Sequence, residues 1–213
     1  MLSGMKQEDI DRAVRHLKAE GTLKKVIQAN PKPDFSGRKN PYHSLVRTII
    51  YQQLSGKAAG TIKQRFLDLY PDVRHPKPED VLKTSDHKLR SVGLSTQKVA
   101  YIKDLSEKFI DGHITSQTLK KMTDDEVRSH LIQIKGIGDW TVDMFLMFTL
   151  GRPDVLPTGD LGIQKGFQRL FNLKKLPEPK KMITLAKLWE PYRTVASWYV
   201  WRVVDGDDGG EGW

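Results

Sequence analysis

Two glycines between two helical patterns form the segment of this sequence best suited to bind a phosphate. The run is Lys135-Gly136-Ile137-Gly138, and a helical pattern begins at Asp139. Glycine adopts backbone conformations that are costly for other residues and lets a partner approach closely. The first amide groups of the second helix carry the positive end of the helix dipole, which attracts anions. Glycine is also common in plain turns between helices, so this run alone is a weak signal.

A single carboxylate stands at the end of a stiff loop further along the chain. The stretch from Gly151 to Gly166 contains two prolines and further glycines, and Asp160 precedes its helical part. A carboxylate can stabilise positive charge developing on a sugar and can take a proton from an attacking water. Asp160 is equally suited to capping the helix that follows. The residue by itself does not decide between these roles.

Helical spacing of apolar residues dominates the elements that must position these groups. No run alternates strictly between apolar and polar residues over the length of a strand, so the sequence predicts an all-α fold. Ser, Asn, Gly and Pro punctuate the pattern where helices begin and end. The predicted helices are Glu8–Glu20, Tyr42–Leu54, Gly56–Tyr70, Glu79–Lys83, Asp86–Val92, Thr96–Ile110, Thr123–Ile134, Asp139–Leu150, Gly159–Phe171, Lys180–Trp189 and Tyr192–Val204.

The length of 213 residues suits one domain of two closely packed lobes. We expect a single domain over residues 1–204. One lobe would span about 40–121, and the other would combine 1–39 with 122–204. The acidic tail at 205–213 has the composition of a disordered segment.

The composition points to a polyanionic partner. Lys and Arg number 35 against 26 Asp and Glu, which gives a net charge of +9. Such a surplus favours nucleic acid or an acidic membrane face, although a basic protein without either partner has the same charge. The absence of cysteine excludes disulfides, thiol nucleophiles and cysteine-bound iron–sulfur clusters. No apolar run has the length of a signal peptide or a membrane span, so we expect an intracellular protein that binds no membrane.

Four ordered blocks of the sequence resemble a known family. The hairpin Leu131-Ile-Gln-Ile-Lys-Gly-Ile-Gly-Asp-Trp-Thr-Val, the Gly/Pro loop and Asp160 resemble the helix-hairpin-helix-Gly/Pro-Asp superfamily of DNA glycosylases. Tyr51-Gln-Gln-Leu-Ser-Gly-Lys and Val92-Gly-Leu-Ser-Thr-Gln-Lys are similar to blocks of its alkylation-repair branch, the DNA-3-methyladenine glycosylase II group. The similarity runs from about Asn40 to Val204.

The resemblance implies a two-lobed helical fold with the active-site cleft between the lobes, and an enzyme of base excision repair. Such an enzyme flips alkylated purines such as 3-methyladenine and 7-methylguanine out of duplex DNA and hydrolyses the N-glycosidic bond. Asp160 would be the catalytic residue, and no cofactor would be required. Relatives that also cut the strand carry a lysine nucleophile two positions after the second glycine. Here that residue is Trp140, so we expect no lyase activity.

Aromatic residues are candidates for the wall of a pocket that holds the flipped base. By resemblance Trp140 and Trp201 line it, with Met144 and Tyr192 beside them, and Met144 stands where some relatives have tyrosine. An indole face attracts the positive charge of an alkylated purine. The alternative is core packing, because Trp198 and Trp201 lie three residues apart, as on one helix face.

The resemblance also assigns contacts with DNA. Gln53 would fill the gap left by the flipped base, and Ser55 occupies a position where some relatives have histidine. The predicted DNA-binding residues are Gln53, Ser55, Gly56, Lys57, Lys135, Gly136, Ile137, Gly138 and Lys165. The carbonyl groups of Ile132, Ile134 and Ile137 would hold a structural Na⁺ or K⁺ ion at the hairpin, as in relatives.

Two other functions stay open at this stage. One is a sensor that binds damaged or abasic DNA with little or no catalysis, and Ser55 and Met144 are the residues that favour it. The other is a bifunctional glycosylase/lyase, against which Trp140 argues. We expect a monomer that binds double-stranded DNA containing alkylated or abasic sites. It would act in the nucleus of a eukaryote or the cytoplasm of a bacterium. The sequence does not rank methylated, ethenoated and deaminated purines as substrates.

Overall fold

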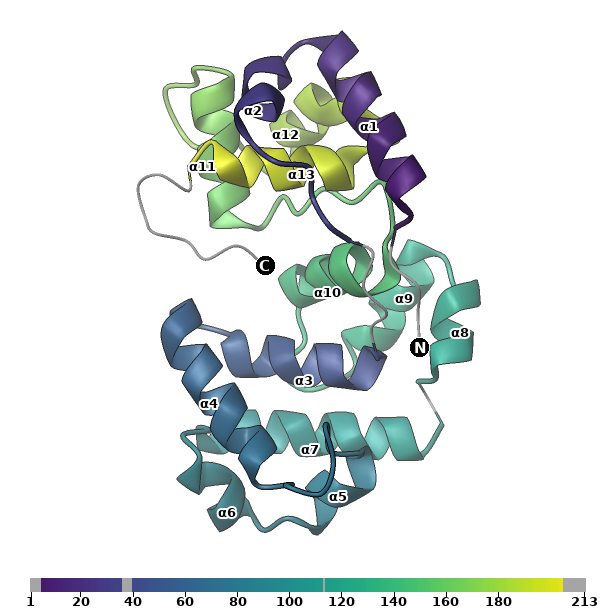
Figure 1. The fold of residues 1–213 in the computed structure, drawn as a ribbon, viewed down its shortest axis with the longest axis vertical. Coiled ribbons are helices and arrows are strands. Elements are labelled where there is room, and N and C mark those ends of the chain that lie inside the picture. Colours follow the sequence, from purple (N-terminus) through teal and green to yellow (C-terminus); the bar gives the residue numbers. More distant parts are fainter. Residues whose placement is uncertain (1–4, 36–39, 113, 205–213) are drawn as a thin grey trace. The chain divides into compact units, whose positions relative to one another are not determined.

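The computed structural model describes residues 5–35, 40–112 and 114–204 (Figure 1). These residues form helices and turns and contain no strand, which confirms the predicted all-α class. The acidic tail at 205–213, for which disorder was predicted, lies outside the described residues. The described residues form two compact units: those within 40–142 make the first, and residues 5–35 and 143–204 make the second.

The first unit is built around one long helix. Helix α7 (Thr96–Ile110) packs against three shorter helices (Figure 1), and its apolar side chains are buried among them. The other helices of this unit are α3 (Pro41–Tyr51), α4 (Gly56–Asp68), α5 (Pro78–Lys83), α6 (Asp86–Ser91), α8 (Ser116–Lys121) and α9 (Asp124–Leu131). Of these, α8 has no counterpart among the helices predicted from the sequence.

The boundary between the units differs from the prediction. The sequence placed it near residue 121, whereas 122–142, with the glycine hairpin, belong to the first unit. The reason is that long-range hydrogen bonds tie the hairpin to the first unit. The backbone N–H of Lys135 donates to Asp104 Oδ2 of α7 at 3.0 Å, and Gln52 Nε2 donates to the carbonyl of Gly136 at 2.8 Å. Nothing in the local sequence pattern shows a bond between residues this far apart along the chain.

Helix α3 ends at Tyr51, three residues before the predicted end at Leu54. The ammonium group of Lys98 donates to the carbonyl oxygens of Ile50 and Gln52, at 2.8 Å each. A continuing helix would have used these carbonyls for its own ladder. The chain instead turns at Gln53, which has a φ of 55°.

The second unit packs the N-terminal helices against the C-terminal ones. Helix α13 (Arg193–Arg202) is buried over most of its length, and the fully buried side chains of Phe167, Trp189 and Tyr199 fill the core around it. The other elements are α1 (Gln7–Glu20), α2 (Lys24–Ala29), α11 (Leu161–Leu170), α12 (Pro179–Ala186) and the short 3₁₀ turn η2 (Lys187–Trp189). Helix α2 was not predicted.

One predicted helix changes its character along its length. The pattern over 139–150 folds as α10 (Asp139–Phe145) followed by a π-helical turn, η1 (Leu146–Leu150). The turn stops at Gly151, whose left-handed φ of 67° suits glycine. π-Helical turns of this kind are rare and occur often at functional sites. The chain passes from the first unit to the second within α10.

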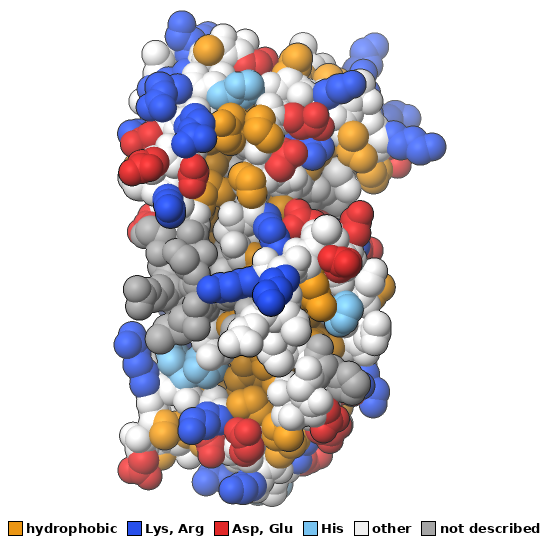
Figure 2. All heavy atoms as spheres, turned by 90° about the vertical axis from the view of Figure 1, so that its right-hand side faces the viewer, with side chains coloured by type: hydrophobic (Ala, Val, Ile, Leu, Met, Phe, Trp, Pro, Cys, Tyr) orange, Lys and Arg blue, Asp and Glu red, His pale blue; other side chains and the backbone are white. Residues whose placement is uncertain are grey.

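The surplus of positive charge is not gathered on the face drawn in Figure 2. Basic and acidic side chains alternate over that face, with apolar side chains between them. Among the described residues, no helix has both the length and the apolar character needed to cross a membrane.

Two glycines let α11 and α13 approach closely in the second unit. A Cβ atom added at Gly166 would lie 2.4 Å from Val200 Cγ1 and 2.7 Å from the Val200 carbonyl oxygen. One turn earlier, a Cβ atom at Gly162 would lie 3.0 Å from the indole of Trp201. These glycines share a face of α11 because they are four residues apart. The close approach of the two helices therefore depends on the absence of side chains at both positions.

We expect Gly166→Ala to lower the free energy of unfolding by about 1–3 kcal/mol, because the added methyl group meets backbone that cannot move away. This is a net loss, because the steric cost exceeds the gain of about 1 kcal/mol in helix propensity that alanine brings. Urea unfolding followed by circular dichroism measures it. The control is Gly159→Ala, where the added Cβ meets nothing within 4 Å. Equal stability of the two variants would show that the helices are not held this close.

Candidate functional site

The Gly/Pro loop before Asp160 is tied at several points to the start of α13. Thr194 Oγ1 donates to the carbonyl of Arg152 at 2.6 Å and accepts from the N–H of Val155 at 3.0 Å. The N–H of Thr194 also donates to the carbonyl of Pro153 at 3.0 Å. These bonds satisfy backbone groups of a segment that has no regular secondary structure. The loop is therefore held in one conformation.

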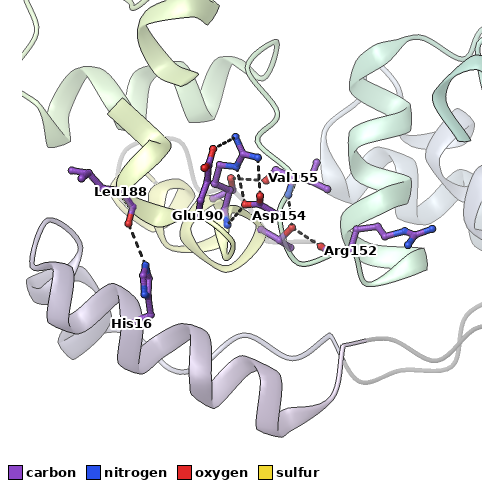
Figure 3. Close-up of polar contacts among 9 residues, drawn as sticks. His16, Arg152, Asp154, Val155, Leu188 and Glu190 are labelled. Atoms are coloured by element: carbon purple, nitrogen blue, oxygen red, sulfur yellow. Dashed lines mark hydrogen bonds and ion pairs between the residues drawn. The ribbon is translucent and has the colours of Figure 1, made fainter. Parts of the chain in front are cut away.

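An ion pair fixes the same end of the loop. Arg193 donates from Nε and Nη2 to the two carboxylate oxygens of Asp154, each at 2.8 Å. Glu190 lies 3.0 Å from the guanidinium as well (Figure 3). The hydrogen bonds to Asp154 raise the pKa of Arg193 above its ordinary value. A paired fork of this kind fixes orientation as well as distance.

The structure shows one of the two roles that the sequence allowed for Asp160, the helix cap. Asp160 is the N-cap of α11, and its Oδ1 accepts from the N–H of Ile163 at 2.9 Å. The same oxygen accepts from Trp201 Nε1 at 2.9 Å. The capping role is therefore confirmed, and the bond from Trp201 is additional to it. Two donors, each 2.9 Å from Oδ1, fix the orientation of the carboxylate. The Asp160 side chain is half-buried and keeps access to solvent.

The indole of Trp201 belongs to a small aromatic cluster around this carboxylate. It stacks on Phe148, with ring centroids 6.0 Å apart and an angle of 25° between the planes. The ring of Phe148 in turn packs against that of Phe35, with 5.6 Å between the two ring centroids. Phe148 comes from the π-helical turn and is half-buried, as is Trp201. The second unit thus presents a stacked aromatic pair directly beside Asp160.

Tyr192, which was expected at the base pocket, contacts helix α1. It is the N-cap of α13 and packs edge-on against His16 of α1, with ring centroids 5.3 Å apart. The His16 ring is held by the carbonyl of Leu188 at 3.2 Å (Figure 3). Tyr192 and Trp201 are nine residues apart on one helix, which separates them by about 13 Å along its axis. The contact that the structure shows for the Tyr192 ring is the one with His16 of α1.

The other two residues expected at the pocket lie on α10. Trp140 is the second residue of that helix and is half-buried. Met144 is almost fully buried, with 2% of its surface exposed. Asp139, at the helix start, is paired with Arg128 of α9 at 2.7 Å. This pair joins the two helices of the hairpin across its turn.

The glycine hairpin is seated on α7 and α3 within the first unit. Gly136 has a φ of 77°, and a Cβ atom there would lie 2.1 Å from the ring of Tyr101. Its carbonyl accepts from Gln52 Nε2 at 2.8 Å. Ile137 is buried, whereas Gly138 is exposed at the start of α10. Gly136 therefore serves packing, and Gly138 leaves the helix start open to a ligand.

The predicted basic contacts are at the surface. The side chain of Lys135 is 72% exposed and its Nζ lies 3.8 Å from Asp104 Oδ1. Lys57 is exposed in the first turn of α4, beside Gly56. Lys165 is half-buried on α11. An exposed ammonium at a long ion-pair distance is little constrained and can turn towards a phosphate.

A tight turn carries the residues predicted to enter the DNA gap. Gln53 and Ser55 are exposed, and Ser55 Oγ caps α4 by accepting from the N–H of Ala58 at 3.4 Å. Between them Leu54 is 39% exposed, although it is a large apolar side chain. Apolar side chains are the ones that proteins insert between base steps. The resemblance brought the whole turn from Gln52 to Ser55 to the minor groove but named Gln53, not Leu54, as the residue that fills the gap.

The carbonyl groups predicted to hold a cation lie in the hairpin turn. Ile134 is buried and its carbonyl accepts from the N–H of Ile137 at 3.1 Å. A carbonyl oxygen has a second lone pair, so this bond is compatible with a cation. Ile132 precedes them and is exposed. No cluster of three or more His, Cys, Asp or Glu suited to a metal occurs within the described ranges.

Comparison with known proteins identifies relatives of the whole domain. The model of the HhH-GPD superfamily base excision DNA repair protein family matches residues 46–191. DNA-3-methyladenine glycosylase 1 of Schizosaccharomyces pombe is 37% identical over 166 residues, which are 78% of this chain and 73% of that protein. The alkylbase DNA glycosidase-like protein mag2 of the same organism is 31% identical over 207 residues, 93% of this chain and 95% of its own.

The fold agrees with a solved structure of one such relative. The 3-methyladenine DNA glycosylase Mag1 of Schizosaccharomyces pombe, in complex with abasic DNA, has a TM-score of 0.81 and 34% sequence identity. The match covers 90% of this chain and 95% of that chain.

We expect Asp160→Asn to keep the free energy of unfolding within about 0.5 kcal/mol, because asparagine caps helices as well as aspartate and accepts the same two bonds. Asp160→Ala should lose about 1–3 kcal/mol, since it removes the cap and leaves the Trp201 N–H without its acceptor. Urea unfolding of the three proteins checks both values. A large loss in Asp160→Asn would show that the carboxylate charge itself holds the fold.

Proposed function

The chain belongs to the HhH-GPD superfamily of base excision DNA repair proteins, and on that premise we propose that it excises alkylated purines from duplex DNA. The bases removed are 3-methyladenine, 7-methylguanine and related lesions. The observation that carries the proposal is the carboxylate of Asp160, held at the end of the Gly/Pro loop by Ile163 and Trp201. The names of the relatives and the match to Mag1 with abasic DNA support it.

The reaction replaces the bond between sugar C1′ and the base nitrogen by a bond to water. The electron pair of the breaking bond leaves with the base, and the sugar passes through an oxocarbenium-like state. The carboxylate of Asp160 stabilises this positive charge and takes the proton of the attacking water. An N3- or N7-alkylated purine is already cationic, so the base leaves without being protonated. The chemistry needs no cofactor.

The stacked pair of Trp201 and Phe148 selects the damaged base. A cationic purine over an indole face gains about 0.5–2 kcal/mol relative to a neutral one, depending on desolvation. The π-helical turn presents Phe148 next to Trp201, so the two rings form one aromatic surface beside Asp160. Trp140 of the first unit replaces the lysine nucleophile of the strand-cutting relatives, so the product is an abasic site in an intact strand.

The first unit binds the DNA backbone. The exposed start of α10 at Gly138 offers amide groups to a phosphate. Lys135 adds a positive charge that attracts the backbone whatever the base sequence. Lys57 at the start of α4 adds a further phosphate contact, and Lys165 of α11 adds one from the second unit. Gln53 and Leu54 at the exposed turn fill the gap left by the flipped base. A monovalent cation on the carbonyls of Ile132, Ile134 and Ile137 stiffens the hairpin without entering the reaction.

We expect the wild type to release 3-methyladenine and 7-methylguanine from methylated duplex DNA and Asp160→Asn to lose this release. Removal of a group that acts on the transition state typically costs orders of magnitude in rate. Chromatography of the freed bases measures the release. Binding to a duplex with a tetrahydrofuran abasic analogue, measured on the same samples, should be kept in the variant.

The other outcomes of this assay select different functions. No release by the wild type, with strong binding to abasic DNA, would make the protein a damage sensor. The similarity to a protein named only as glycosidase-like and the use of Ser55 as a helix cap favour that second candidate. Strand cleavage without added alkali would overturn the role of Trp140.

We expect Lys135→Met to weaken binding to undamaged and abasic duplexes by the same factor. Each lost phosphate contact makes the slope of log K against log salt shallower by about 0.9. Fluorescence anisotropy over a range of salt concentrations measures the slope. The control is Lys83→Met, which removes the same charge from α5 of the same unit. A loss confined to one of the two duplexes would show that Lys135 reads the lesion instead of the backbone.

A further inference from the structure

One side of α7 carries three side chains that bind two separate DNA-facing segments. Lys98, Tyr101 and Asp104 follow one another at intervals of three residues, so they lie along one side of the helix. Lys98 bonds to the turn after α3, whereas Tyr101 and Asp104 contact the glycine hairpin. The family resemblance gave Lys98 no role, and the proposed chemistry does not use it.

The Lys98 ammonium is committed to backbone. Its Nζ donates to the carbonyl oxygens of Ile50 and Gln52, at 2.8 Å each, and the side chain is half-buried. Burial lowers the pKa of this ammonium from its ordinary value. A charged donor on two carbonyls is among the stronger hydrogen bonds in a protein. The two carbonyls flank the point where α3 ends, so the bonds hold the chain in its turn.

The turn itself is strained. Gln53 has a φ of 55°, a left-handed conformation that is unfavourable for residues with a side chain. Its side chain and that of Leu54 are exposed. Strain of this kind persists only where the surroundings enforce it. In this structure the hydrogen bonds from Lys98 to the carbonyl oxygens of Ile50 and Gln52 hold the turn in this conformation.

Gln52 connects the turn to the hairpin directly. Its carbonyl accepts from Lys98, and its side-chain Nε2 donates to the carbonyl of Gly136 at 2.8 Å and to Thr141 Oγ1 at 3.3 Å. On the other side, Asp104 Oδ2 accepts the backbone N–H of Lys135 at 3.0 Å. The turn and the hairpin are thus bonded to each other and to the same helix, all within the first unit.

We propose that Lys98 is a positioning residue for lesion recognition: it holds the turn at Gln53 and Leu54 in register with the hairpin, so that one bound phosphate aligns the inserting side chains with the gap. The inference rests on the proposed function in that the turn must enter damaged DNA, but it does not depend on excision. Lys98 acts through the turn and touches no DNA itself.

The test separates positioning from direct contact by measuring Lys98→Met on two duplexes. We expect the preference for a tetrahydrofuran-containing duplex over the undamaged one to fall roughly tenfold, as expected when a hydrogen-bonded buried charge is lost. The affinity for undamaged duplex and its salt slope should equal those of the wild type. A shallower slope, like that of Lys135→Met, would mean that Lys98 contacts a phosphate and would overturn the proposal.

A fluorescent base gives a second readout that a general loss of stability would not produce. With 2-aminopurine beside the tetrahydrofuran site, insertion of a side chain changes the stacking of the probe and hence its fluorescence. Lys98→Met should lose this change at saturating protein, and Lys98→Arg should restore it because the guanidinium can donate to the same carbonyls. Lys108→Met removes the same charge from the same helix and should behave as wild type. A full signal in Lys98→Met would overturn the proposal.

One further variant keeps the result interpretable. If Lys98→Met does not fold by circular dichroism, Gln52→Met tests the same connection, because it removes the bonds to Gly136 and Thr141 while keeping a side chain of similar length. It should lose the same preference with the same unchanged salt slope. A wild type that prefers abasic DNA without releasing any base would end the proposed excision and leave this inference standing. Unchanged preference in Lys98→Met and Gln52→Met would end this inference alone.

Discussion

The hydrogen bond from the Trp201 indole to Asp160 is the interaction on which the rest of the candidate active site depends. It requires α11 and α13 to lie closer than side chains would permit, and Gly162 and Gly166 provide that approach. The start of α13 is tied in turn to the Gly/Pro loop through Thr194, so the loop, the carboxylate and the indole are fixed by one pair of helices. A catalytic group gains most when its orientation is set before the substrate arrives.

In the first unit a helix likewise fixes the orientation of the segments that bind DNA. Helix α7 carries the apolar side chains of its core on one side and polar groups for two irregular segments on another. Turns and hairpins have few hydrogen bonds of their own, so their geometry is set by what they are bonded to. The proposed catalytic carboxylate and the turn and hairpin proposed to bind DNA are thus each held by helices of their own unit. The exposed residues lie at the ends of loops.

Several site residues were predictable because their signals are local. Asp160 as a cap, Ser55 as a cap and Gly151 as a helix end follow from conformational preferences that act over three or four residues. The roles of Tyr192 and Leu54 were not predictable in the same way. Tyr192 faces His16, far along the chain, and Leu54 is exposed because a distant side chain ends α3 early.

The sequence by itself determined the all-α class, most helices and the family, because apolar periodicity, caps and ordered motifs are properties of neighbouring residues. The tertiary structure alone decided which groups meet: Trp201 with Asp160, Phe148 with Trp201, and Lys98 with the turn after α3. It also assigned residues 122–142 to the first unit. These contacts join residues tens of positions apart, and no local preference encodes a bond that forms only after helices have packed.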